Sequence, residues 1–142
     1  MTIEPTSWFI QCLDELFNKP DIHIIDEIFA PSLIAHVPMM PTLTRSGFKS
    51  FIQSFYTAFP DFNMEIDDTI ITQNTFVLRV TYYGKHQGDF LGIRATGHEV
   101  VISSVHIFRT ENDLIVENWA EIDIFGLLGQ LGRGNGYSPS KN

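Results

Sequence analysis

Cysteine is almost absent from this sequence. Its only cysteine, Cys12, has no partner for a disulfide within the chain. Cys12 falls within a helical apolar pattern, which favours a place in the core. No pair of cysteine and histidine residues has the spacing of a zinc site, so no metal is expected.

Positive charge is also scarce. Nine Lys and Arg residues stand against 17 Asp and Glu residues, which gives a formal net charge of −8. Nucleic acids and anionic membranes both require a basic surface on their partner. We therefore expect neither as a partner of this chain.

Long hydrophobic runs are missing as well. No stretch approaches the ~18 apolar residues of a membrane span, and no basic segment followed by an apolar one opens the chain. The simplest expectation is a cytoplasmic protein. Hydrophobic residues make up 44% of the chain and aromatic residues 13%, enough for one domain with its own core. We expect this domain to span residues 1–132, and the polar tail 133–142 to be flexible.

The first half of the sequence has the apolar periodicity of helices. Proline and glycine, together with potential capping residues, set their expected limits. Two prolines at Pro38–Pro41 predict a loop, placed over the mouth of a pocket. The expected elements are a helix Ser7–Asn18 capped by Ser7, a second helix from a cap at Asp21 to Phe29, an extended segment Leu33–Val37, and a helix from a cap at Ser46 to Phe59.

The second half alternates apolar and polar residues, as half-buried strands do. Strands are expected at 62–71, 75–83, 100–109 and 114–122, with a bent glycine-rich excursion at Gly84–Gly97. The short polar turn Thr110–Asp113 predicts that the last two strands form an antiparallel hairpin. Helices followed by antiparallel strands indicate an α+β fold with the helices on one face of the sheet.

The alternation in this hairpin separates two faces. Ser104, His106 and Phe108 share one face of the first strand, and Asn118 and Ala120 share one face of the second. The opposite faces carry a set of charged and apolar residues: Val105, Ile107, Arg109, Glu117, Trp119 and Glu121, with Asp123 at the strand end. Polar groups thus occur among apolar ones on both faces, and we expect one face to line a pocket.

Several segments resemble the SnoaL-like polyketide cyclases of the nuclear-transport-factor-2-like superfamily. They are GKHQGDFLGIRATG at Gly84–Gly97, HIFR at His106–Arg109, IVENW at Ile115–Trp119 and LLGQLG at Leu127–Gly132, with AFPD at Ala58–Asp61. The resemblance implies a curved antiparallel sheet wrapped around N-terminal helices, with a conical cavity between them. It also implies a homodimer formed through the outer sheet face, near Trp119.

Family cyclases work without a cofactor and close a ring by intramolecular aldol addition. Such a reaction needs a base that removes a proton next to a carbonyl group, and a donor that stabilises the enolate oxygen. His106 matches the histidine of these enzymes. Their catalytic aspartate falls on Ala120, a neighbouring histidine on Asn118 and a glutamine on Ser104. Alanine cannot transfer a proton, so the original aldol chemistry is in question here.

Two carboxylates near the missing aspartate are candidate substitutes. Glu121 and Asp123 have the wrong parity for the cavity unless the strand is bulged or curls inward at its end. The alternative is that both are solvated charges at the sheet edge. His106 has two interpretations as well: a hydrogen-bonded core histidine, or an acid, base or donor in the pocket.

Further polar residues are candidates for substrate binding. His36 resembles a histidine common in the family after the second helix, and His86 could contact a ligand or stabilise the glycine-rich turn. Tyr56 and Tyr82 could donate to a ligand carbonyl, although tyrosines are common at cavity rims. Ser104 and Asn118 complete the set.

Two classes of function stay open at this point. The first is a cofactor-independent cyclase or isomerase that acts by acid–base chemistry on a small hydrophobic, carbonyl-bearing, polyketide-like substrate. The second is a small-molecule-binding protein that keeps the cavity after loss of the catalytic aspartate.

Overall fold

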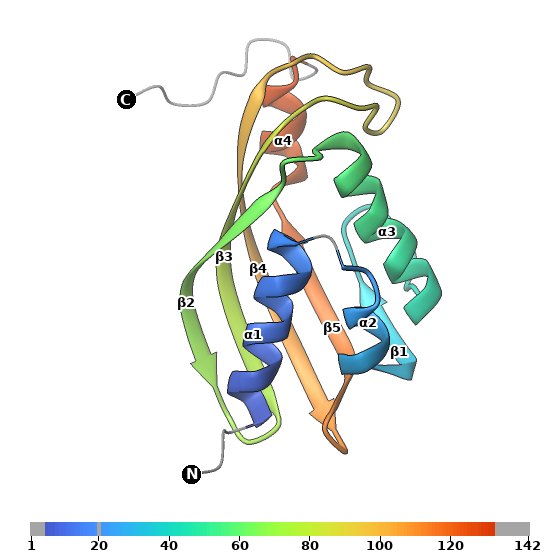
Figure 1. Ribbon diagram of the computed structural model, residues 1–142, viewed down its shortest axis with the longest axis vertical. Coiled ribbons are helices and arrows are strands. Elements are labelled where there is room, and N and C mark those ends of the chain that lie inside the picture. Colours follow the sequence, from blue (N-terminus) through green and yellow to red (C-terminus); the bar gives the residue numbers. More distant parts are fainter. Residues whose placement is uncertain (1–4, 20, 133–142) are drawn as a thin grey trace.

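The computed structural model describes residues 5–19 and 21–132 of the chain (Figure 1). The tail 133–142, expected to be flexible, and Pro20, which we expect from the sequence to end the first helix, lie outside these ranges. The helices are α1 (Pro5–Asn18), α2 (Ile24–Ile28), α3 (Arg45–Ala58) and α4 (Ile124–Gln130). The strands are β1 (Phe29–His36), β2 (Asn63–Ile71), β3 (Thr75–Lys85), β4 (Glu99–Glu111) and β5 (Leu114–Ile122).

The five strands form one curved sheet in the order β1-β5-β4-β3-β2. Consecutive strands from β2 to β5 pair antiparallel. β1 instead pairs parallel with β5, from which most of the chain separates it. The α+β fold with a curved sheet is therefore confirmed, and this one pair makes the sheet mixed rather than antiparallel throughout.

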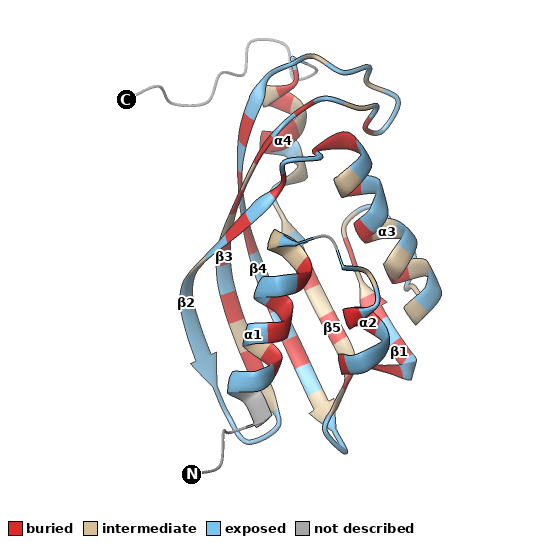
Figure 2. Cartoon of the chain, viewed as in Figure 1, coloured by how far each residue is buried: buried red, intermediate tan, exposed pale blue. Residues whose placement is uncertain are grey.

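Helices α1, α2 and α3 lie on one face of the sheet (Figure 1), which is the face where buried residues concentrate (Figure 2). Burial alternates strictly along β4 from Glu99 to Arg109. Ser104, His106 and Phe108 are buried, whereas Val105 and Ile107 are exposed. The predicted division of the hairpin into two faces is confirmed.

Helix starts differ from those expected. α1 begins at Pro5, two residues before Ser7. Thr44 rather than Ser46 caps α3, since its hydroxyl accepts a hydrogen bond from the Gly47 amide at 3.2 Å. Asp21 accepts a hydrogen bond from the His23 amide at 3.1 Å, but α2 starts only after His23. Each of these turns contains more than one residue able to cap, and the sequence does not rank them.

The glycine-rich excursion between β3 and β4 packs on the end of α3. The amides of Gln87 and Gly88 donate to the Ala58 carbonyl at 2.8 and 3.1 Å. The loop thus supplies the hydrogen bonds that this carbonyl at the end of the helix lacks within the helix. A Cβ at Gly88 would clash with the Thr57 carbonyl oxygen, which explains the glycine. The loop thereby holds α3 in place over the sheet.

Within the described ranges, no helix combines the length and apolar character needed to cross a membrane.

Candidate active site

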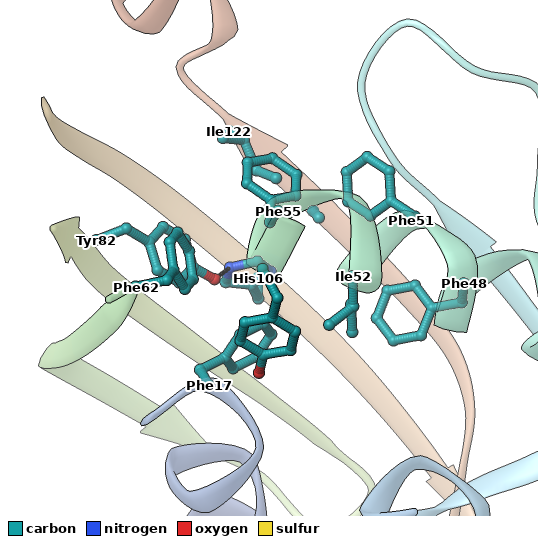
Figure 3. A pocket seen from close by; sticks show the side chains of 11 residues that line it. Phe17, Phe48, Phe51, Ile52, Phe55, Phe62, Tyr82, His106 and Ile122 are labelled. Carbon is teal, nitrogen blue, oxygen red and sulfur yellow. Dashed lines mark hydrogen bonds between the residues drawn. The ribbon is translucent and has the colours of Figure 1, made fainter. Parts of the chain in front are cut away.

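A cavity lies between α3, the end of α1 and the inner face of the sheet (Figure 3). Its free volume is about 30 Å³, room for about two water molecules. A carbonyl compound larger than this free volume must therefore displace aromatic side chains to enter. The lining consists of Phe17, Phe48, Phe51, Ile52, Phe55, Tyr56, Phe62, Tyr82, His106, Ala120 and Ile122.

His106 is the titratable base of this cavity. It lies in the middle of β4, directly opposite Ala120 of β5, and is only 5% exposed. Its ring stacks with the rings of Phe17 and Phe108, whose centroids are 6.3 and 5.9 Å away. Burial among these rings disfavours the imidazolium ion and lowers the pKa of His106 from 6.5 to about 4. The side chain is therefore neutral at neutral pH.

Two hydroxyl groups converge on one nitrogen of this imidazole. The Tyr82 Oη lies 2.5 Å and the Ser104 Oγ 3.0 Å from His106 Nε2. Figure 3 shows the Tyr82 hydroxyl turned toward the ring. Burial raises the pKa of Tyr82, with a smaller contribution from Tyr56, so the phenol stays protonated.

The buried Tyr82 hydroxyl has no other acceptor among the described residues, so it donates to Nε2. A neutral imidazole that accepts at Nε2 carries its proton on Nδ1. Nδ1 makes no hydrogen bond to a described residue. In this tautomer His106 is a neutral ring whose Nδ1–H has no hydrogen-bond partner among the described residues.

Helix α1 contributes the Phe17 wall and is tied to its neighbours by two polar residues. The Asn18 carboxamide accepts from the Met64 amide at 2.6 Å and donates to the Met64 carbonyl at 3.1 Å, which joins α1 to β2. The Tyr56 hydroxyl of α3 donates to the Leu16 carbonyl of α1. Tyr56 therefore lines the cavity as expected, but its hydroxyl bridges the two helices, and burial raises its pKa.

Asn118 is buried on the same face of β5 as Ala120, with 1% exposure. Neither its Oδ1 nor its Nδ2 has a hydrogen-bond partner among the described residues. An unpaired buried amide costs about 1–3 kcal/mol, so this arrangement is unusual for a folded protein. The side chain does not itself line the cavity in this structure.

Glu121 and Asp123 lie away from His106. The register is regular where a bulge was considered, because His106 faces Ala120, Val105 faces Glu121 and Ser104 faces Ile122. Glu121 is consequently exposed on the outer face of the sheet. Asp123 is the N-cap of α4, where its Oδ1 accepts from the Gly126 amide at 2.8 Å. Among the described residues, no carboxylate lines the cavity.

His36 lies on the outer face rather than in the cavity. Its Nε2 is 2.8 Å from Glu117 Oε2, and its ring stacks on Trp119 with the two planes 8° apart. Arg109 completes this outer cluster, since it donates to Glu117 at 3.0 Å and lies 5.1 Å above the Trp119 ring. The expected place of His36 in a binding pocket is not observed, because pairing β1 with β5 turns residue 36 outward beside Trp119.

His86 is fully buried in the glycine-rich excursion and likewise does not line the cavity. Its Nδ1 accepts from the Thr96 amide at 3.1 Å, and its ring packs 5.5 Å from that of Phe59. Burial lowers its pKa. Of the two interpretations offered by the sequence, these contacts support stabilisation of the loop.

The sequence did not single out Phe17, Phe62 or Ile122 as cavity residues, although each lines the cavity. Phe17 was visible only as one apolar position of a helix. Its place at the last turn, next to the Asn18 anchor, makes it a wall of the site. The phenylalanines of α3 belong to the core or pack against it, and they also line the cavity.

These features define an α+β protein of the nuclear-transport-factor-2-like fold, with a buried, neutral histidine in the lining of an aromatic cavity. The family model described as SnoaL-like polyketide cyclase matches residues 9–131. The chain therefore belongs to the SnoaL-like polyketide cyclase family.

Solved structures of similar proteins cover nearly the whole chain. TsrD from Streptomyces laurentii is 24% identical with a TM-score of 0.83, and the match covers 94% of this chain and 98% of that one. IdmH from Streptomyces antibioticus, described as a candidate polyketide cyclase, is 27% identical with a TM-score of 0.78, covering 92% and 99%. AclR from Streptomyces galilaeus, described as a candidate hydroxylase, is 23% identical with a TM-score of 0.85, covering 96% and 89%. No curated protein matches the chain.

Proposed function

We propose that this protein is a cofactor-independent cyclase or isomerase that acts on a small hydrophobic substrate with a carbonyl group. The observation that carries the proposal is the buried, neutral His106, with the Tyr82 and Ser104 hydroxyls at its Nε2, in the lining of an aromatic cavity. Family membership supports a reaction of the cyclase or isomerase type.

In the proposed mechanism, the His106 Nδ1–H donates to the substrate carbonyl oxygen. Negative charge that develops on this oxygen during enolisation is stabilised by a donor already oriented by Tyr82 and Ser104, in a site from which water is largely excluded. The aromatic walls hold a flexible substrate in the folded shape needed for ring closure.

The base that removes the proton from the α-carbon of the substrate is a water molecule or a second oxygen of the substrate. The resemblance to the family places Ala120 where those enzymes have their aspartate, and no described carboxylate lines the cavity. The proposal therefore requires a substrate whose α-proton is already acidic.

Ala120 also supports a second candidate function, that of a non-catalytic binder of small hydrophobic molecules. The two functions differ in one observable property. An enzyme of this type accelerates exchange of the α-protons of a bound ketone with solvent, whereas a binder takes up the ketone without accelerating exchange.

The test uses 2-tetralone, a hydrophobic ketone, dissolved in deuterium oxide with the protein, and follows loss of the α-proton signal by NMR. We expect saturable acceleration of exchange that falls to the buffer rate in His106→Ala. Ala120→Asp places a carboxylate opposite His106 and should raise the rate. Saturable binding with no acceleration in any of the three proteins would leave the binder as the function, and thermal melts of each variant control for folding.

We further propose that the protein forms a homodimer through the outer face of the sheet. Val101, Val105 and Ile107 are exposed there, with Val101 at 53%, beside the cluster of Trp119 and Arg109. Exposed apolar side chains with charges of both signs beside them suit a two-fold contact with a second copy.

A further inference from the structure

Tyr56 borders both the cavity and a hollow on the surface of the protein. The hollow measures about 520 Å³ and lies between α3 and the segment that precedes α2. Its lining consists of Ile22, Gln53, Tyr56 and Thr57. Tyr56 also belongs to the lining of the cavity, so a movement of this side chain changes both spaces at once.

A hydrogen bond holds Tyr56 in this position. Its hydroxyl donates to the Leu16 carbonyl near the end of α1. A helix carbonyl normally accepts from the amide four residues further on, as Glu15 does from Lys19 at 2.8 Å. The corresponding residue for Leu16 is Pro20, which has no N–H. Tyr56 therefore supplies a donor that the sequence of α1 cannot provide.

The turn of α1 that Tyr56 contacts also carries the Phe17 wall. The Phe17 ring lies 5.7 Å from that of Tyr82 and extends from α1 toward His106 (Figure 3). Asn18 joins the same turn to the backbone of Met64 on β2. Since the Asn18 bonds keep α1 attached to the sheet, breaking the Tyr56 bond frees the tyrosine without releasing the helix.

A second surface hollow also shares a residue with the cavity but offers no passage. It measures about 390 Å³ and includes Ile122 together with Val105 and Glu121, which are exposed on the outer face of the sheet. The paired strands β4 and β5 lie between this hollow and the cavity, with Val105 facing Glu121 and Ser104 facing Ile122. Entry here would require breaking the backbone hydrogen bonds of the sheet.

We infer that ligands enter the cavity from the hollow on α3 and that Tyr56 is the gate of this entrance. The gate is closed while the Tyr56 hydroxyl is bonded to Leu16, and it opens when the side chain turns away from the cavity. This inference rests on the proposed function, because it takes the cavity to be the ligand site. The hollow is lined by apolar Ile22 and the uncharged polar Gln53 and Thr57, so the entrance suits a neutral molecule.

The experiment measures access to the cavity without requiring any affinity. Ala120→Cys places a thiol in the cavity lining, opposite His106. Methyl methanethiosulfonate, a small neutral reagent, labels this thiol when the gate opens, and mass spectrometry of the peptides gives the labelling rate. Cys12 is buried but lies outside the cavity lining, so its own rate reports unfolding in the same sample.

Three variants of the Ala120→Cys protein test the entrance. Tyr56→Phe removes the hydrogen bond of the gate and should raise the labelling rate about fivefold, the change that corresponds to one typical hydrogen bond. Gln53→Trp fills the hollow and should slow labelling several-fold. Ser54→Trp, also exposed on α3 but outside the lining of the hollow, is the matched control and should leave the rate unchanged. The rate at Cys12 should be the same in all of these proteins.

Several results would overturn the inference. Labelling in Gln53→Trp that is no slower than in Ser54→Trp would place the entrance elsewhere. An unchanged rate in Tyr56→Phe, or an equal acceleration at Cys12, would show that Tyr56 is no gate. A thiol that stays unlabelled in every folded protein would show that no entrance opens. The reagent reports access alone, so absence of proton exchange in 2-tetralone would not affect these results.

Discussion

Burial of His106 makes the stability of the protein depend on pH. Folding lowers the pKa of this residue from 6.5 to about 4, so between these two values the unfolded chain binds a proton that the folded chain does not. The free energy of unfolding therefore decreases as the pH falls through 6.5, and the loss is complete near pH 4. Each pKa unit corresponds to about 1.4 kcal/mol, so His106 accounts for a loss of about 3 kcal/mol.

The perturbation that isolates this effect is His106→Gln. Glutamine does not titrate, and its side-chain oxygen can still accept a hydrogen bond from Tyr82. Urea unfolding followed by circular dichroism, from about pH 8 to about pH 4, gives the free energy of unfolding of both proteins at each pH. Carboxylates and the other histidines titrate in both proteins, so their contributions cancel in the difference.

We expect the difference between wild type and His106→Gln to change by about 3 kcal/mol across this range, with the wild type losing more at low pH. His23→Gln, at an exposed position, serves as the control for removal of an imidazole from the surface. Parallel pH profiles for the wild type and His106→Gln would refute the buried, neutral state of His106.

Three further predictions concern the cap of α4, entry to the cavity and the outer face of the sheet. Asp123→Ala removes the cap of α4 and should lower the free energy of unfolding in urea by about 1 kcal/mol, whereas Asp123→Asn should stay close to the wild type. Proton exchange in 2-tetralone should be unchanged in both variants. A loss of exchange would show that Asp123 takes part in the reaction. Tyr56→Phe removes the hydrogen bond from the Tyr56 hydroxyl of α3 to the Leu16 carbonyl of α1. NMR line shapes should then show several-fold faster exchange of 2-tetralone between its bound and free states. Unaltered rates of binding and release would exclude this hydrogen bond as a barrier to entry. Val105→Glu combined with Ile107→Glu should convert a dimer to a folded monomer in sedimentation; a dimer that persists would place the contact elsewhere.

The faces of β4 and β5 could be predicted because period-two alternation encodes them directly. Polar residues at positions 104 and 106 share the parity of buried Phe108, so their place on the inner face follows from the spacing alone. The family resemblance also gave the curved sheet and its cavity. The hydrogen bond between the Tyr82 hydroxyl and His106 could not be predicted from this spacing, since Tyr82 belongs to the neighbouring strand β3.

Other features depend on contacts between distant parts of the chain. His36 was expected in the pocket, but its orientation is set by the parallel pairing with β5 and by Glu117, 81 residues further along. Helix α4 was not expected, because two glycines within 124–130 lower its helical propensity. Its Asp123 cap and the packing of Leu127 stabilise it, and together they explain why Asp123 is unavailable to the cavity.

The state of the His106 imidazole is the central claim of this account. Nitrogen-15 NMR of histidine-labelled protein distinguishes a protonated ring nitrogen from one with a free lone pair. We expect His106 to carry its single proton on Nδ1 at neutral pH, with Nε2 accepting from Tyr82, and to become an imidazolium only near pH 4. A proton on Nε2, or titration near the ordinary value of 6.5, would contradict it.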